Sequence, residues 1–298
     1  MDFSFDPAHD AFLADVQHFA TDVVAPRAAE IDATGVFPRD LITQAAAVGL
    51  TGVTLPTGVG GGGRPYATYA TALESVSAAS ATVAVILSVT NSLVAEPVFE
   101  FGTAAQKDLW LGRLASGAVL GAFALSEAQA GSDAGNQQTT ARLDDRGYVI
   151  SGRKVWVANA EVAEVAIVFA ATQPGASGRG VSAFLVPLSS PGITRVPSPD
   201  SLGVRGLGCM DLVCDDVRVD ADALLGDSGK GFRIAMRALE GGRVAIAAQA
   251  LGVGQAALDE AVDYAKRREA FGQPIGNFQA IQFQLADLAT DLEAARML

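Results

Sequence analysis

The sequence predicts a multidomain α+β protein with a helical N-terminal part, a β-rich middle part and a helical C-terminal part. We place the domains at residues 1–120, 121–228 and 229–298. Apolar residues recur at helical spacing in the first and last of these parts, whereas short β-type apolar runs fill the middle. At 298 residues and 50% hydrophobic content, the chain is long enough to bury substantial cores.

The charge balance excludes one broad class of partner. Asp and Glu total 33 against 21 Lys and Arg, so the formal net charge is −12. Such a chain repels phosphate backbones, and we expect no nucleic-acid partner. An anionic ligand would need local arginines or backbone N–H groups. The two cysteines and two histidines have no metal-ligand spacing, so we expect neither a disulfide framework nor a metal site.

The N-terminal part predicts a series of helices. Phe12, Val16 and Phe19 repeat at helical spacing, and Pro26 is expected to end that helix. The most apolar stretch, residues 78–89, falls short of the ~20 residues of a membrane span and predicts a buried helix. Residues 1–6 lack the pattern of a signal peptide, so we expect a soluble cytoplasmic protein without a membrane partner.

The middle part predicts strands at residues 148–150, 165–169, 181–186 and 212–219. Residues 144–147 read as a hairpin turn between two of these runs. Residues 58–63 match a dinucleotide-binding glycine pattern literally. Because no strand–helix unit frames them, a glycine loop is the better interpretation.

The C-terminal part predicts one long helix over residues 232–265 and a second helix from about Phe278. An apolar stripe at helical spacing runs along the second helix up to Leu298, with no Gly, Asn or Pro to close it. Two long amphipathic helices cannot bury their faces alone, and a bundle usually needs four. We therefore expect either an incomplete bundle or a partner that covers this face.

Two segments have the character of a ligand site. In residues 123–133 an apolar strand leads to a hydroxyl, an acid and a turn of small residues, where backbone N–H groups can approach a ligand. Residues 154–160 place Trp156 in a neighbouring strand. Taken singly, the first could be an ordinary turn and the tryptophan an ordinary core residue.

These segments occur in register with residues 203–226, 239–252 and 268–279, and together they resemble the acyl-CoA dehydrogenase family, most nearly its short-chain members. The resemblance covers nearly the whole chain. It implies an N-terminal helical domain, a middle β-barrel and a C-terminal four-helix bundle that is incomplete here. FAD would lie between the barrel and the bundle.

The resemblance also implies a site and a reaction. FAD would contact Phe123, Leu125, Ser126, Gly131, Trp156, Ala158, Arg268, Phe271 and Gln279, the last three from a neighbouring subunit. Acyl-CoA would contact Ser132, Glu240, Gly241, Gly242 and Arg243. The reaction would be α,β-dehydrogenation of the thioester to the enoyl-CoA, with an electron-transferring flavoprotein as acceptor. The chain would form a homo-oligomer, either a dimer or a tetramer, or a hetero-oligomer.

Two departures from the family pattern keep alternatives open. The family's usual catalytic glutamate is missing. Most members place it beyond the matched segments, and a minority place it at the position that Gly242 occupies here. Glu240 is a weak candidate, since residues two apart do not share a helix face. Ala158 replaces a usual threonine near the flavin. The alternatives are a non-catalytic acyl-CoA- or FAD-binding subunit completed by a partner chain, or a flavin oxygenase or oxidase on the same scaffold.

Overall fold

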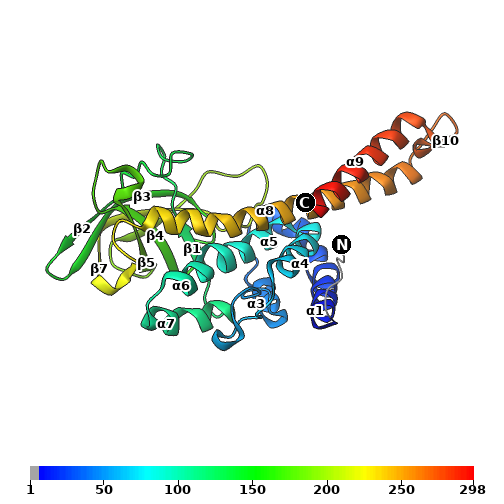
Figure 1. Ribbon diagram of the computed structural model, residues 1–298. Helices are drawn as coiled ribbons and strands as arrows, with labels where there is room; N and C mark the ends of the chain where they lie inside the picture. Colours follow the sequence, from blue (N-terminus) through cyan, green and yellow to red (C-terminus); the bar gives the residue numbers. More distant parts are fainter. Residues whose placement is uncertain (1–6) are drawn as a thin grey trace.

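The computed structural model describes residues 7–298, so the expectation about a signal peptide lies outside the described residues (Figure 1). The N-terminal part is helical, as predicted, and its seven α-helices run in a compact group beneath the long helix α8, Gly231–Arg267. They are α1 Pro7–His18, α2 Ala28–Thr34, α3 Arg39–Val48, α4 Tyr66–Ala79, α5 Ala81–Ser88, α6 Glu96–Phe101 and α7 Ala104–Ala115.

The prediction that Pro26 ends the first helix is wrong. The regular α-helix ends earlier, at His18. The chain then continues as a wider helical turn, a π-helix, over Phe19–Val24. Pro26 then lies at the start of the tight 3-10 turn Ala25–Arg27, which leads directly into α2. A proline is tolerated in the first turn of a helix, because its missing N–H would have no partner there. The helical run therefore passes Pro26 and ends at Gly35.

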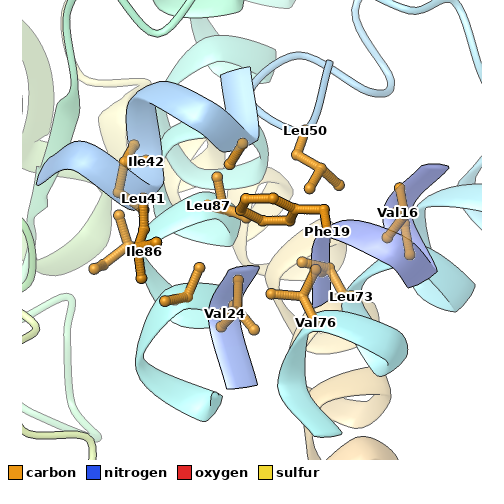
Figure 2. Packing of buried hydrophobic residues seen from close by; sticks show 14 of the residues in the cluster. Val16, Phe19, Val24, Leu41, Ile42, Leu50, Leu73, Val76, Ile86 and Leu87 are labelled. Atoms are coloured by element: carbon orange, nitrogen blue, oxygen red, sulfur yellow. The ribbon is translucent and has the colours of Figure 1, made fainter. Parts of the chain in front are cut away.

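A hydrophobic core joins the N-terminal helices to one another. Phe19 lies at its centre, surrounded by buried aliphatic side chains of α3, α4 and α5 (Figure 2). Ala245 and Ala248 of α8 complete the same cluster. The close approach of α8 depends on Gly252, where a Cβ atom would lie 2.3 Å from the carbonyl oxygen of Glu74. The core thus fixes α8 against α4.

The apolar stretch at residues 78–89 is largely buried, but it is not one helix. Ser80 ends α4 and caps α5, accepting a hydrogen bond from the N–H of Val83. The longer helical run Ala81–Phe101 has the length and apolar composition of a membrane span. However, 78% of its most apolar window is buried inside the protein, which is typical of a core helix.

The middle part is an eight-stranded sheet in the order β6-β7-β3-β2-β4-β5-β8, with β1 paired in parallel to β4. The predicted hairpin at residues 144–147 is confirmed, since Asp144 pairs with Gly147. The glycine segment at 58–63 is a loop whose backbone N–H groups donate to carbonyl oxygens of residues 52–56. The strands are β1 Gly121–Ala124, β2 Thr140–Asp144, β3 Gly147–Val157, β4 Val165–Ala171, β5 Val181–Pro187, β6 Ile193–Pro197, β7 Met210–Val219 and β8 Leu224–Leu225.

Within residues 7–298, the strand pairing leaves β6 and β8 as the two ends of this sheet. The pairing therefore shows a sheet-containing middle domain, and it does not show whether the sheet closes into a barrel. The C-terminal part consists of α8, Gly231–Arg267, and α9, Gln279–Met297, joined by the short strands β9 Glu269–Ala270 and β10 Gln273–Pro274. Both predicted helices are confirmed. Their far halves project from the body as a hairpin, and no residue of α9 is buried (Figure 1).

Candidate functional site

Two of the predicted site segments lie in contact. Strand β1 delivers Phe123 to the start of the loop 125–139, and the N–H of Val155 on β3 donates to the carbonyl of Ser126 at 2.9 Å. Phe123 packs edge-on against Phe169, and Leu125 is buried, whereas Ser126 is half-buried. The start of the loop is therefore fixed to the core and to β3, whereas the hydroxyl of Ser126 remains partly exposed.

The turn beyond Ser126 faces open space. Gly131 and Ser132 are both exposed, and a Cβ atom at Gly131 would meet nothing within 4 Å. Small residues at this turn leave the backbone N–H groups accessible. The predicted cofactor and substrate contacts of this segment are thus available to a ligand.

A buried ion pair holds this loop to β3, and sequence reasoning had not singled it out. Nζ of Lys154 donates to Oε1 of Glu127 at 2.7 Å and to the carbonyl of Leu125 at 3.2 Å, and it also contacts the side-chain oxygen of Gln137. Burial lowers the pKa of Lys154 to about 8. Burial acts to raise the pKa of Glu127, but Lys154 and the N–H groups around it hold that pKa below its usual value.

Trp156 lies two residues along the same strand and is 50% exposed. Its φ is +55°, in the left-handed region that bulky side chains rarely adopt. Its N–H donates to Oδ1 of Asp211 on β7 at 3.1 Å. Ala158 follows, half-buried, just beyond the end of β3. The structure thus brings the predicted residues 123–132 and 156–158 into one neighbourhood.

The predicted substrate segment on α8 has two distinct faces. Glu240 and Arg243 are exposed, and the carboxylate of Glu240 accepts from Arg237 at 3.0 Å. Gly241 is buried, and a Cβ atom there would lie 2.4 Å from the hydroxyl of Tyr66. A Cβ atom at Gly242 would lie 2.9 Å from Leu93. The paired, exposed carboxylate of Glu240 does not have the environment of a free base.

Under Gly241 lies a carboxylate that the sequence analysis missed. The hydroxyls of Tyr66 and Thr54 both donate to Glu96, and Asn91 donates through Nδ2 at 3.1 Å. Burial raises the pKa of Glu96 despite these donors. An acid inside the apolar run Ala81–Phe101 was the available sequence signal.

The remaining predicted cofactor residues lie elsewhere. Arg268 precedes β9, Phe271 lies between β9 and β10, and Gln279 begins α9, all at the far tip of the projecting hairpin (Figure 1). All three are exposed, and Phe271 is 97% exposed. Because a helix rises 1.5 Å per residue, the 37-residue α8 carries this tip roughly 50 Å from its own N-terminal end, which packs on β5. Within one chain, these residues do not join Trp156.

A basic hollow of about 550 Å³ lies at the N-terminal end of α8. Arg179, Lys230 and Arg233 line it, together with the small residues of two turns. A Cβ atom at Gly135 would lie 3.1 Å from the backbone nitrogen of Gly178, so the loop that carries Ser132 adjoins this hollow. In a chain of net charge −12, this is a local site suited to an anion.

Comparison with known proteins places the chain in a family. Three domain models match: acyl-CoA dehydrogenase N-terminal domain over residues 6–118, middle domain over 122–217 and C-terminal domain over 229–298. The human mitochondrial short-chain specific acyl-CoA dehydrogenase is 44% identical over 290 residues, which cover 97% of this chain and 70% of that protein.

Two solved structures show the same fold. Butyryl-CoA dehydrogenase from Megasphaera elsdenii superposes with a TM-score of 0.96 at 41% identity, covering 99% of this chain and 78% of that one. A chain from a structure described as the electron transferring flavoprotein of Acidaminococcus fermentans gives a TM-score of 0.97 at 38% identity, covering 100% and 78%. With its three matched domains and these relatives, the chain belongs to the acyl-CoA dehydrogenase family.

Proposed function

We propose that this protein oxidises a short acyl-CoA thioester between its α and β carbons, with FAD as the electron acceptor. The observation that carries the proposal is the contact between the 125–139 loop and the Trp156 segment, which joins the two motifs of the family resemblance. The relatives named above, a short-chain specific acyl-CoA dehydrogenase and a butyryl-CoA dehydrogenase, favour a short acyl group.

The residues present fit a flavin. An exposed indole on a constrained backbone offers a flat apolar face, and the open turn at Gly131 offers backbone donors. Ser126 and Trp156 would hold the ring, and Ala158 would lie beside it. FAD, when bound, supplies a hydride acceptor. The chain's own part is to orient the thioester against the ring and to exclude water from that contact.

The basic hollow fits the other end of the substrate. Coenzyme A carries phosphates, which guanidinium and ammonium groups bind well. Arg179, Lys230 and Arg233 would hold these phosphates, with Ser132 in the adjoining loop contacting the connecting arm. The Glu240 carboxylate, held by Arg237 on the exposed side of α8, is better suited to fixing that arginine than to taking a proton.

The position of Arg268, Phe271 and Gln279 at the hairpin tip supports assembly. Only a flavin on another copy of the chain would come within reach of these residues, so we infer a homo-oligomer, with a tetramer as one arrangement. We also infer an electron-transferring flavoprotein as the redox partner, a cytoplasmic location, domain boundaries near residues 120 and 228, and a barrel-like closure of the sheet.

The test is an anaerobic absorbance spectrum of the purified protein before and after addition of butyryl-CoA. Bleaching of a flavin band is the expected result. A flavin band that persists would contradict the dehydrogenase proposal. If the flavin is then reduced chemically, its rapid reoxidation in air would favour the oxidase alternative, for which Ala158 is the supporting feature. A protein that holds no flavin would favour the binding-subunit alternative.

A further inference from the structure

The strand that carries Trp156 is irregular at that residue. Where β7 has the single residue Asp211, β3 has two, Val155 and Trp156, so the ladder contains a bulge. Bulges turn a side chain out of the regular alternation and leave one residue unpaired. Trp156 is the bulged residue with positive φ, a conformation that glycine adopts freely and tryptophan does not. The backbone of Trp156 therefore needs a specific hydrogen-bond partner that keeps it in this conformation.

Asp211 is that hydrogen-bond partner. Its Oδ1 accepts from the N–H of Trp156 at 3.1 Å and from the hydroxyl of Ser198 at 3.0 Å. Its Oδ2 accepts from Nη2 and Nε of Arg153 at 2.7 and 3.2 Å. The aspartate side chain is 8% exposed, against 56% for Arg153. The bulge thus has a buried carboxylate acceptor where a regular ladder would supply a carbonyl.

The state of this carboxylate suits a constant acceptor. Burial acts to raise the pKa of Asp211, but hydrogen bonds from Arg153, Trp156 and Ser198 outweigh it and hold that pKa below its usual value. The carboxylate is therefore ionised at neutral pH. Hydrogen bonds to an ionised acceptor are stronger than those to a neutral one.

We propose that Asp211 is a positioning residue, whose carboxylate holds Trp156 in its left-handed conformation and so sets the indole for the flavin. The flavin part of this statement rests on the proposed function. The conformational part does not, because it concerns the chain alone. Neither the family motif nor the spacing of the strands singled out Asp211.

The sheet offers a matched control. Asp144 also accepts a backbone N–H, that of Arg146 at 3.0 Å, and an arginine, Arg218 at 2.7 Å. It lies at the β2–β3 turn, away from the bulge. Asp144→Ala therefore removes a comparable carboxylate elsewhere in the sheet, and it shows how far a general loss of stability alone changes the signals of Trp156.

The experiment uses Trp110→Phe as background, so that Trp156 is the one fluorophore of its kind. In the absence of FAD, we expect Asp211→Ala to increase acrylamide quenching and to weaken the near-ultraviolet circular dichroism of the indole. Asp144→Ala should change neither signal. Asp211→Asn keeps an oxygen acceptor and should restore most of both signals.

With FAD added, Asp211→Ala should raise the Kd for FAD about tenfold, because binding would then have to order the Trp156 backbone that the carboxylate no longer holds. Unchanged indole signals in Asp211→Ala without FAD, or equal changes in the Asp144 control, would overturn the positioning role. If the alanine variant does not fold, Asp211→Glu keeps the charge but moves the oxygen, and it should shift the same signals. Failure of the wild-type chain to bind FAD would count against the proposed function, leaving the indole measurement to decide the role of Asp211.

Discussion

Nζ of Lys154 lies 2.7 Å from Oε1 of Glu127, and the two side chains are 0% and 2% exposed. Every further partner of this pair belongs to the loop between Leu125 and Thr139. A fully buried ion pair is costly to form, but removing one partner leaves an uncompensated charge. The pair therefore ties the loop to β3 through the lysine side chain, in addition to the backbone bond from Val155 to Ser126.

Replacing Lys154 with methionine should lower the free energy of unfolding by about 3–5 kcal/mol, because Glu127 would remain buried and unpaired. Denaturant unfolding measures this directly. The double variant Lys154→Met, Glu127→Leu should recover most of the loss, since two apolar groups of similar volume carry no stranded charge.

Arg218→Met is the control for this prediction. The pair of Arg218 and Asp144 has the same 2.7 Å separation, but its side chains are 53% and 22% exposed. Exposed pairs contribute about 0–1 kcal/mol, so the control should change the stability little. A Lys154→Met variant no less stable than Arg218→Met would show that the buried pair does not hold the loop.

Regular elements were predictable from the sequence where one local signal decides them. The hairpin at residues 144–147 and the long helix α8 follow from turn chemistry and periodicity. The helical run past Pro26 did not, because a proline can either end a helix or begin one. Likewise, the bulge at Trp156 depends on the register between β3 and β7, and no local pattern contains that register.

The functional site, like the fold, was only partly predictable from the sequence. Motif resemblance predicted that the segments of Ser126 and Trp156 belong together, and the structure places them in contact. It did not identify Lys154 or Asp211, because a charged residue on a strand normally predicts an exposed position. Their burial is set by the surrounding sheet and loop, which tertiary packing alone determines.

Gly241→Ala should destabilise the protein by about 1–3 kcal/mol, the usual range for forcing extra volume into a packed interior. The new Cβ atom would lie 2.4 Å from the Tyr66 hydroxyl and 3.1 Å from Oε2 of Glu96. Gly242→Ala is the matched control, because its new atom meets only a flexible leucine side-chain end, that of Leu93. Thermal unfolding of both variants measures the difference. Equal melting temperatures would mean that α8 shifts freely over Tyr66.

Glu96 should make stability depend on pH. Burial raises its pKa above the ordinary value, so the folded state binds a proton more readily than the unfolded state does. The stability that proton binding to Glu96 contributes is fully present below the unfolded pKa of 4.5 and is lost as the pH rises through the folded pKa. Relative to wild type, Glu96→Gln should therefore gain stability as pH rises above that range. Unfolding curves at a series of pH values measure the gap, and parallel curves for the two proteins would contradict this assignment.

The double charge reversal Arg179→Glu, Lys230→Glu should raise the KM for butyryl-CoA roughly tenfold, equivalent to about 1.4 kcal/mol, and leave kcat nearly unchanged. The reason is that the hollow would bind the phosphates, which take no part in the chemical step. The same variant should use a butyryl thioester without phosphates as well as the wild-type protein does. Arg142→Glu, Lys107→Glu gives the same change of net charge on surfaces away from the hollow and should leave KM unaltered. Higher salt should shrink the difference, because screening weakens exposed charge contacts. An equal rise in KM for both thioesters would place the phosphates elsewhere.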